Sequence, residues 1–73
     1  MKKNLKEEVG KKLKERREQL KLTQRQVAQR LGVAQPVYHR FEKGIFECSY
    51  EQLYALCKLF DLSADFLLGL SDY

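Results

Sequence analysis

One short segment of the chain concentrates side chains that can form hydrogen bonds with nucleobases. On a helical wheel, one side of this segment carries Pro36, His39, Arg40 and Lys43, and Gln35 stands at its N-terminal end. Glutamine can bind adenine, and arginine can bind guanine, through paired hydrogen bonds to the base edge. We therefore expect this face to contact bases; the alternative is that the polar side chains only face water.

The opposite side of the same segment is suited to holding a helix against a core. Tyr38 and Phe41 fall on this side, and so does Glu42. Arg17 falls on the apolar stripe of an earlier predicted helix. Because an unpaired buried charge costs several kcal/mol, such groups are usually paired. We predict a structural ion pair between Arg17 and Glu42; the alternative is that both side chains extend into solvent.

A second short helix is predicted just before this segment. Thr23 and Gln26 have the spacing of a capping box, which starts a helix, and Gly32 has the conformational freedom that ends one. The next helix begins near Gln35, since proline is favoured as a first helical residue. Two short helices joined by a tight glycine turn predict a helix-turn-helix motif over residues 23–43, which places its second helix in the major groove of DNA.

The start of the first helix of this motif is a second candidate contact. Helix N-termini bind phosphate through free backbone N–H groups. We therefore expect Thr23, Gln24 and Arg25 to lie against the DNA backbone.

The rest of the chain is predicted to be helical as well. A first helix runs from about Leu5 to Leu20, a fourth follows the cap Ser49, and a short fifth follows the cap Ser63. Gly10 weakens the first helix, so residues 1–8 are expected to be a frayed extension. The fold class is therefore all-α, with five helices in one domain over residues 1–73.

Charge is unevenly distributed along the chain. The net charge is +4, but residues 1–44 hold 13 of the 14 Lys and Arg, whereas residues 45–73 hold one basic residue and five acidic ones. A basic first part suggests that one side of the molecule faces a polyanion. The alternative is a basic helix that is simply solvated.

Catalytic and metal-binding functions are not expected. His39 is the single histidine, and with Cys48 and Cys57 it matches no zinc-ligand spacing. No nucleophile and base pair or glycine-rich phosphate loop is recognisable, so we expect no enzyme activity, cofactor or metal. Without a secretory leader or an apolar run of membrane-spanning length, a cytoplasmic protein with free thiols and no membrane association is expected.

The motif L-T-Q-x-x-V-A-x-x-L-G-V-x-Q, followed by aromatic-Glu-x-Gly, resembles the lambda-repressor-like, Cro/repressor-type (XRE) helix-turn-helix family. The resemblance covers about residues 9–70 and extends to the ending Phe66-Leu67-Leu68-Gly69. It implies a compact five-helix domain that is usually dimeric and binds operator DNA without a cofactor. It also implies a phosphate contact for Gln24, base-reading positions at Gln35, Pro36 and Arg40, and an Arg17–Glu42 pair. The expected DNA-contacting set is Thr23, Gln24, Arg25, Gln35, Pro36, Val37, His39, Arg40 and Lys43.

Three features depart from the family pattern. Ala34 replaces a frequent serine cap, and Pro36 can offer a base only apolar contact. The loop from Ile45 to Cys48 is apolar and acidic where the family usually has basic residues. We expect this loop to lower DNA affinity. The alternative is that Ile45 and Phe46 form an apolar patch that binds a protein partner. We also expect at least one of these two side chains to fold back on the core.

The leading hypothesis is a sequence-specific DNA-binding regulator, a repressor that binds a near-palindromic operator as a homodimer. The candidate dimer surface comprises Phe66, Leu67, Leu70 and Tyr73; the alternative is that these residues only close the monomer core. The competing hypothesis is a protein-interaction module on the same scaffold, such as an antitoxin or anti-repressor.

Overall fold

The computed structural model describes residues 4–72, and this part of the chain contains five helices and no strand. The helices are α1 (Leu5–Gln19), α2 (Gln24–Leu31), α3 (Gln35–Glu42), α4 (Tyr50–Phe60) and α5 (Ala64–Leu68). The expected all-α fold class and the order of the helices are therefore confirmed. Residues 1–3 of the expected N-terminal extension, and Tyr73, lie outside the described residues.

Local sequence signals start and end these helices. The capping boxes of Thr23 with Gln26 and of Ser49 with Gln52 are both complete. In each box the hydroxyl accepts from a backbone N–H while the glutamine side chain accepts from the cap's own N–H, which satisfies two donors at the helix start. Gly32 ends α2 with φ of 73°, a left-handed conformation that costs little only for glycine.

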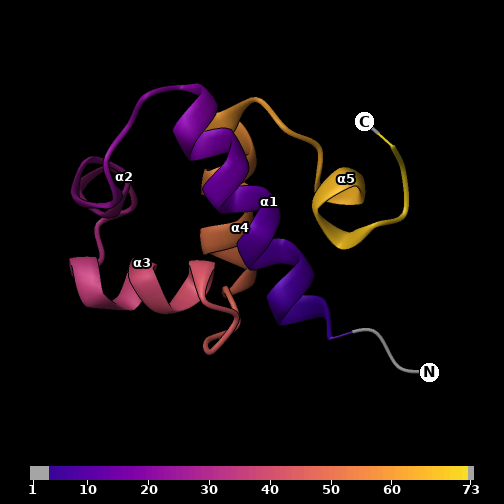
Figure 1. Ribbon diagram of the computed structural model, residues 1–73, viewed down its shortest axis with the longest axis horizontal. Helices are drawn as coiled ribbons and strands as arrows, with labels where there is room; N and C mark the ends of the chain where they lie inside the picture. Colours follow the sequence, from indigo (N-terminus) through magenta and orange to yellow (C-terminus); the bar gives the residue numbers. More distant parts are fainter. Residues whose placement is uncertain (1–3, 73) are drawn as a thin grey trace.

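The five helices surround one apolar core. Figure 1 shows α1 running through the middle of the molecule, with α2 and α3 on one side of it and α5 on the other. Each of the helices α1 to α5 contributes to the core, which comprises Leu13, Val27, Ala28, Tyr38, Phe41, Leu56, Phe60 and Leu67. Burial of these side chains from helices far apart in the sequence fixes α3 against α1 and α2.

Gly10 serves the packing of α1 against α3. It is buried, and a Cβ atom placed on it would lie 2.5 Å from the backbone oxygens of both Phe41 and Glu42. The expectation that Gly10 marks a weak point of the first helix is therefore incomplete: the absent side chain lets the α1 backbone approach the end of α3.

Candidate nucleic-acid interface

The outer face of α3 is built by two aromatic rings beneath it. Tyr38 is fully buried and Phe41 is 3% exposed, and their rings meet edge to face with centroids 6.2 Å apart. Because both rings are held in the core, α3 cannot rotate about its axis without exposing them. The opposite face is therefore held toward solvent.

The sequence-predicted residues of α3 occupy this outer face. Val37 is half-buried, and the exposed residues are Gln35, Pro36, His39, Arg40 and Lys43. The N-cap position Ala34 makes no side-chain hydrogen bond, so the start of α3 lacks the serine cap that the family often has. This leaves the first N–H groups of α3 without side-chain partners from the cap.

The start of α2 lies beside this face. Thr23 and Arg25 are exposed, and Gln24 is half-buried. The Gln24 amide nitrogen donates to Glu42 Oε1 at 2.9 Å, and its oxygen lies 3.2 Å from His39 Nδ1. Gln24 therefore joins the start of α2 to both the inner and the outer side of α3. One hydrogen of the amide nitrogen remains for a further acceptor such as phosphate.

Arg17 and Glu42 form an ion pair beneath the interface. Arg17 Nε lies 2.6 Å from Glu42 Oε2, and a second guanidinium nitrogen donates to Oε1 at 3.1 Å. The guanidinium also donates to the backbone oxygen of Leu22, 2.9 Å away, at the turn before α2. The pair thus ties together the end of α1, the turn before α2 and the end of α3.

The environment favours the ionised form of Glu42. Burial by itself would raise the pKa of Glu42, but the interactions with Arg17, with the nearby Tyr38 hydroxyl and with Gln24 outweigh it and lower the pKa below its ordinary value. The same contact raises the pKa of Arg17 against the opposing effect of burial. Burial, followed by the interaction with Glu42, raises the pKa of the Tyr38 hydroxyl. Arg17 and Glu42 are therefore both charged, and the Tyr38 hydroxyl and the Gln24 amide next to them are neutral.

Arg40 is positioned by its neighbours at the end of α3. Its guanidinium lies 5.4 Å from the centre of the Phe46 ring, and a guanidinium nitrogen donates to the Pro36 oxygen at 3.4 Å. A cation above an aromatic face is attracted to it while its edge stays open to hydrogen bonding. Phe46 thus acts on the outer face of α3 rather than on the core.

The expectation that Ile45 or Phe46 folds back on the core is wrong. Ile45 is 58% exposed and Phe46 is 41% exposed. The backbone N–H groups of both residues bond to the carbonyl oxygen of Arg40, which directs the turn away from the core. Together with Val37 and Phe41 they border a shallow depression beside α3.

Two lysines on α1, Lys11 and Lys14, were not among the residues predicted to contact DNA. They line a depression between α1, α2 and α3 that Gln24, His39 and Lys43 also line. Their spacing contains the signal, because Lys11, Lys14 and Arg17 follow one another at three-residue steps and so share a helix face. These lysines extend the basic character of α3 onto α1.

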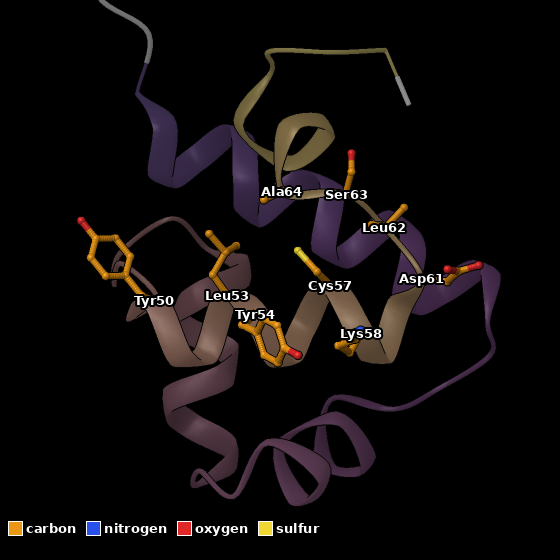
Figure 2. A pocket seen from close by; sticks show the side chains of 9 residues that line it. All are labelled: Tyr50, Leu53, Tyr54, Cys57, Lys58, Asp61, Leu62, Ser63 and Ala64. Atoms are coloured by element: carbon orange, nitrogen blue, oxygen red, sulfur yellow. The ribbon is translucent and has the colours of Figure 1, made fainter.

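A second exposed surface runs along α4 and α5. Figure 2 shows a groove whose rim carries Tyr50, Tyr54 and Lys58, with Leu53 and Cys57 along α4 and Leu62 on the connection to α5. Tyr50 is 90% exposed and Tyr54 is 67% exposed, with the Lys58 ammonium 5.6 Å from the Tyr54 ring centre. Burial raises the pKa of the Cys57 thiol, which lies within this groove. The groove is separate from the outer face of α3.

The candidate dimer surface requires a correction. Leu67 is fully buried in the core and cannot touch a second copy of the chain. Phe66 is half-buried, with the Lys12 ammonium 5.0 Å from its ring centre. Leu70 is 76% exposed, and Tyr73 lies outside the described residues. The helical spacing of α5 could not separate the side that closes the core from the side that faces outward.

Within residues 4–72, no group of three or more His, Cys, Asp or Glu side chains is arranged to hold a metal ion. None of the helices in this range combines the length and apolar character needed to cross a bilayer.

A family model described as helix-turn-helix matches residues 13–67, which extend from the middle of α1 into α5. The chain belongs to the helix-turn-helix family. The resemblance to its XRE-type members is thereby confirmed, and the matched region contains the whole of α2 and α3.

Two curated relatives come from Bacillus subtilis (strain 168). The uncharacterized HTH-type transcriptional regulator YqaE is 41% identical over 56 residues, which cover 77% of this chain and 48% of the relative. The uncharacterized HTH-type transcriptional regulator YobD is 35% identical over 60 residues, which cover 82% of this chain and 54% of the relative. The chain thus spans about half the length of these relatives. No solved structure matches it significantly.

Proposed function

We propose that this helix-turn-helix domain binds double-stranded DNA in a sequence-specific manner and regulates transcription, as a repressor. The observation that carries the proposal is the outer face of α3, where exposed Gln35, His39 and Arg40 stand above the buried rings of Tyr38 and Phe41. A polar helix face that is fixed in direction can enter a major groove and present its side chains to base edges.

The surroundings of α3 support contact with the DNA backbone. Thr23 and Arg25 at the start of α2, Lys43 at the end of α3, and Lys11 with Lys14 on α1 offer donors or positive charge around the outer face. Phosphate contacts position a protein on the duplex, whereas base contacts determine the sequence. We also propose that a regulator acting on DNA in this way is cytoplasmic.

Enrichment from a pool of random duplexes tests the proposal directly. We expect the purified chain to select a consensus site and to lose affinity steeply as salt concentration rises. Arg40→Ala should fold and should lose preference at one base pair, by about 1–3 kcal/mol of discrimination. Recovery of random sequence from the unaltered protein would refute sequence-specific binding.

We further propose that the domain acts as a homodimer on a near-palindromic operator. Two copies would place their α3 helices about 34 Å apart, one turn of DNA. Leu70, exposed beside the half-buried Phe66, supports a contact surface at the end of α5. Sedimentation of the unaltered chain and of Leu70→Glu, with and without operator, tests this proposal, because only the former should dimerise.

A second candidate function is binding of a protein partner, as in an antitoxin or anti-repressor. The exposed Ile45 and Phe46 support it, and so does the apolar groove along α4 and α5. A chain that performs only this function would bind random duplexes weakly and select no consensus site. The selection experiment therefore distinguishes this function from sequence-specific DNA binding.

A further inference from the structure

Glu42, Gln24 and His39 form a hydrogen-bonded chain whose direction can be determined. An ionised carboxylate can only accept hydrogen bonds. Because the pKa of Glu42 is lowered by its partners, the carboxylate is ionised near neutral pH. The atom of Gln24 that lies 2.9 Å from Glu42 Oε1 must therefore be the amide nitrogen, which donates.

This orientation of Gln24 determines where His39 carries its proton. With the amide nitrogen turned toward Glu42, the amide oxygen faces His39 Nδ1 at 3.2 Å. An amide oxygen only accepts, so Nδ1 must donate. A neutral imidazole carries one N–H, and the other ring nitrogen, Nε2, is then an acceptor with a free lone pair.

The position of the His39 ring determines where the Nε2 lone pair points. His39 is exposed on the outer face of α3 that also carries Arg40 and Lys43. Since Nδ1 faces Gln24 at the start of α2, the Nε2 edge of the ring points away from that amide. Arg40 and Lys43 can only donate hydrogen bonds, so His39 adds an acceptor beside them, and the other acceptor on this face is the amide oxygen of Gln35 at the start of the helix.

We infer that Glu42, acting through Gln24, holds His39 as its Nδ1–H tautomer, and that Nε2 reads the exocyclic amino group of an adenine or a cytosine. The inference rests on the proposed DNA-binding function for the identity of its ligand. In the major groove these amino groups are the donors that bases present. His39 is then a specificity-determining residue, and Gln24 and Glu42 are positioning residues.

The tautomer can be measured without DNA. His39 is the only histidine in the chain, so nitrogen-15 NMR of the imidazole gives one unambiguous pair of ring signals. We expect a protonated Nδ1 and an unprotonated Nε2 in the neutral form of the ring in the folded protein. A dominant Nε2–H form would overturn the inference.

A matched pair of variants tests the role of Gln24. Gln24→Ala removes the acceptor of the Nδ1 proton, so we expect the tautomer population to move toward Nε2–H. The control Gln29→Ala changes an exposed residue of the same helix and should leave the signals unchanged. Equal tautomer populations in the two variants would show that Gln24 does not position the ring.

Two replacements of His39 separate its two nitrogens in DNA selection. The amide of His39→Asn can reach Gln24 but not the position of Nε2, whereas His39→Gln can place its amide oxygen near the Nε2 position. We expect His39→Asn to lose about fivefold preference for adenine or cytosine at one position, and His39→Gln to retain most of it.

The DNA selections distinguish base reading by His39 from DNA binding by the domain as a whole. If the unaltered chain selects a site and His39→Asn selects the same site equally well, base reading by His39 is refuted while DNA binding stands. If the unaltered chain selects no site, the proposed function fails, and base reading by His39 fails with it. The NMR result still decides the tautomer in that case.

Discussion

Among single residues, Glu42 connects α1, α2 and α3 beneath the interface. Its carboxylate accepts from the Arg17 guanidinium and from the Gln24 amide, and only 2% of its side chain is exposed. Removing one partner of a buried ion pair is strongly destabilising, because the other charge is left buried without compensation. This loss of stability is much larger than the stability that the intact pair adds relative to apolar residues of similar size. Adjacent Lys43 is exposed and provides a natural comparison.

Glu42→Ala should therefore lower the free energy of unfolding by about 3–5 kcal/mol, whereas Lys43→Ala should change it by less than about 0.5 kcal/mol. Urea denaturation followed by circular dichroism measures both. If Glu42→Ala is too unstable to fold, the double variant Arg17→Ala, Glu42→Ala should be the more stable of the two, because no buried charge is then left without a partner. Equal midpoints for Glu42→Ala and Lys43→Ala would contradict a buried pair.

The same carboxylate makes stability depend on acid. Because the pKa of Glu42 is lower in the folded protein than its ordinary value, the unfolded chain binds the proton more tightly. The stabilisation is therefore present at neutral pH and is lost as the pH falls below the ordinary pKa of a glutamate and through the lower folded-state pKa of Glu42. Urea midpoints measured between neutral and acidic pH should show this loss.

The Glu42→Gln variant should show a flatter pH profile than the unaltered protein. Exposed Glu47 supplies the control, and Glu47→Gln should keep the full acid dependence. Parallel profiles for Glu42→Gln and the unaltered protein would exclude Glu42 as the source.

Among the helices, the contact between α1 and α3 positions the outer face. Gly10 permits this contact, since a Cβ atom there would collide with backbone oxygens of Phe41 and Glu42 rather than with a movable side chain. Helix propensity and packing thus favour opposite outcomes at this position. Propensity alone predicts that alanine would stabilise α1 by about 1 kcal/mol.

Because the collision involves backbone, we expect packing to prevail, and Gly10→Ala should destabilise the domain by about 1–3 kcal/mol. Thermal unfolding of Gly10→Ala is compared with Glu15→Ala, a change at an exposed site of the same helix that should be nearly neutral. A higher melting temperature for Gly10→Ala would contradict the close packing of α1 against α3.

Over the whole molecule, the charge asymmetry of the sequence becomes a spatial one. The basic residues 1–44 include α1, α2 and α3, and the acidic residues 45–73 include α4 and α5. Lys11 and Lys14 lie beside His39 and Lys43, so the positive charge continues from α3 onto α1. Affinity for a polyanion then depends on helices outside the helix-turn-helix motif.

The double variant Lys11→Ala, Lys14→Ala should consequently weaken DNA binding on all sequences to a similar degree. Each lost phosphate contact should reduce the slope of log affinity against log salt by about 1, giving a total of about 2. Lys58→Ala on α4 is the control and should leave the slope unchanged. An unaltered slope for the double variant would remove α1 from the DNA footprint.

Much of this fold could be predicted because its signals are local. The caps Thr23, Ser49 and Ser63 act on residues of the same turn, and the glycine at the end of α2 acts through its own φ. The burial of Tyr38 and Phe41 followed from helical periodicity, which needs no knowledge of the partner helix. A helix-turn-helix of these bounds is therefore encoded in short stretches of sequence.

Other features depend on which segments meet in space. Sequence spacing did not indicate that Leu67 is buried or that Phe46 is exposed. It also gave no sign of the close approach of α1 to α3 at Gly10 or of the Gln24–His39 contact, because the contacting residues are far apart in the sequence. Periodicity distinguishes the two sides of a helix but not which neighbour covers each side. Long-range packing makes that choice, because the apolar surface of five helices can be buried together in only a few arrangements.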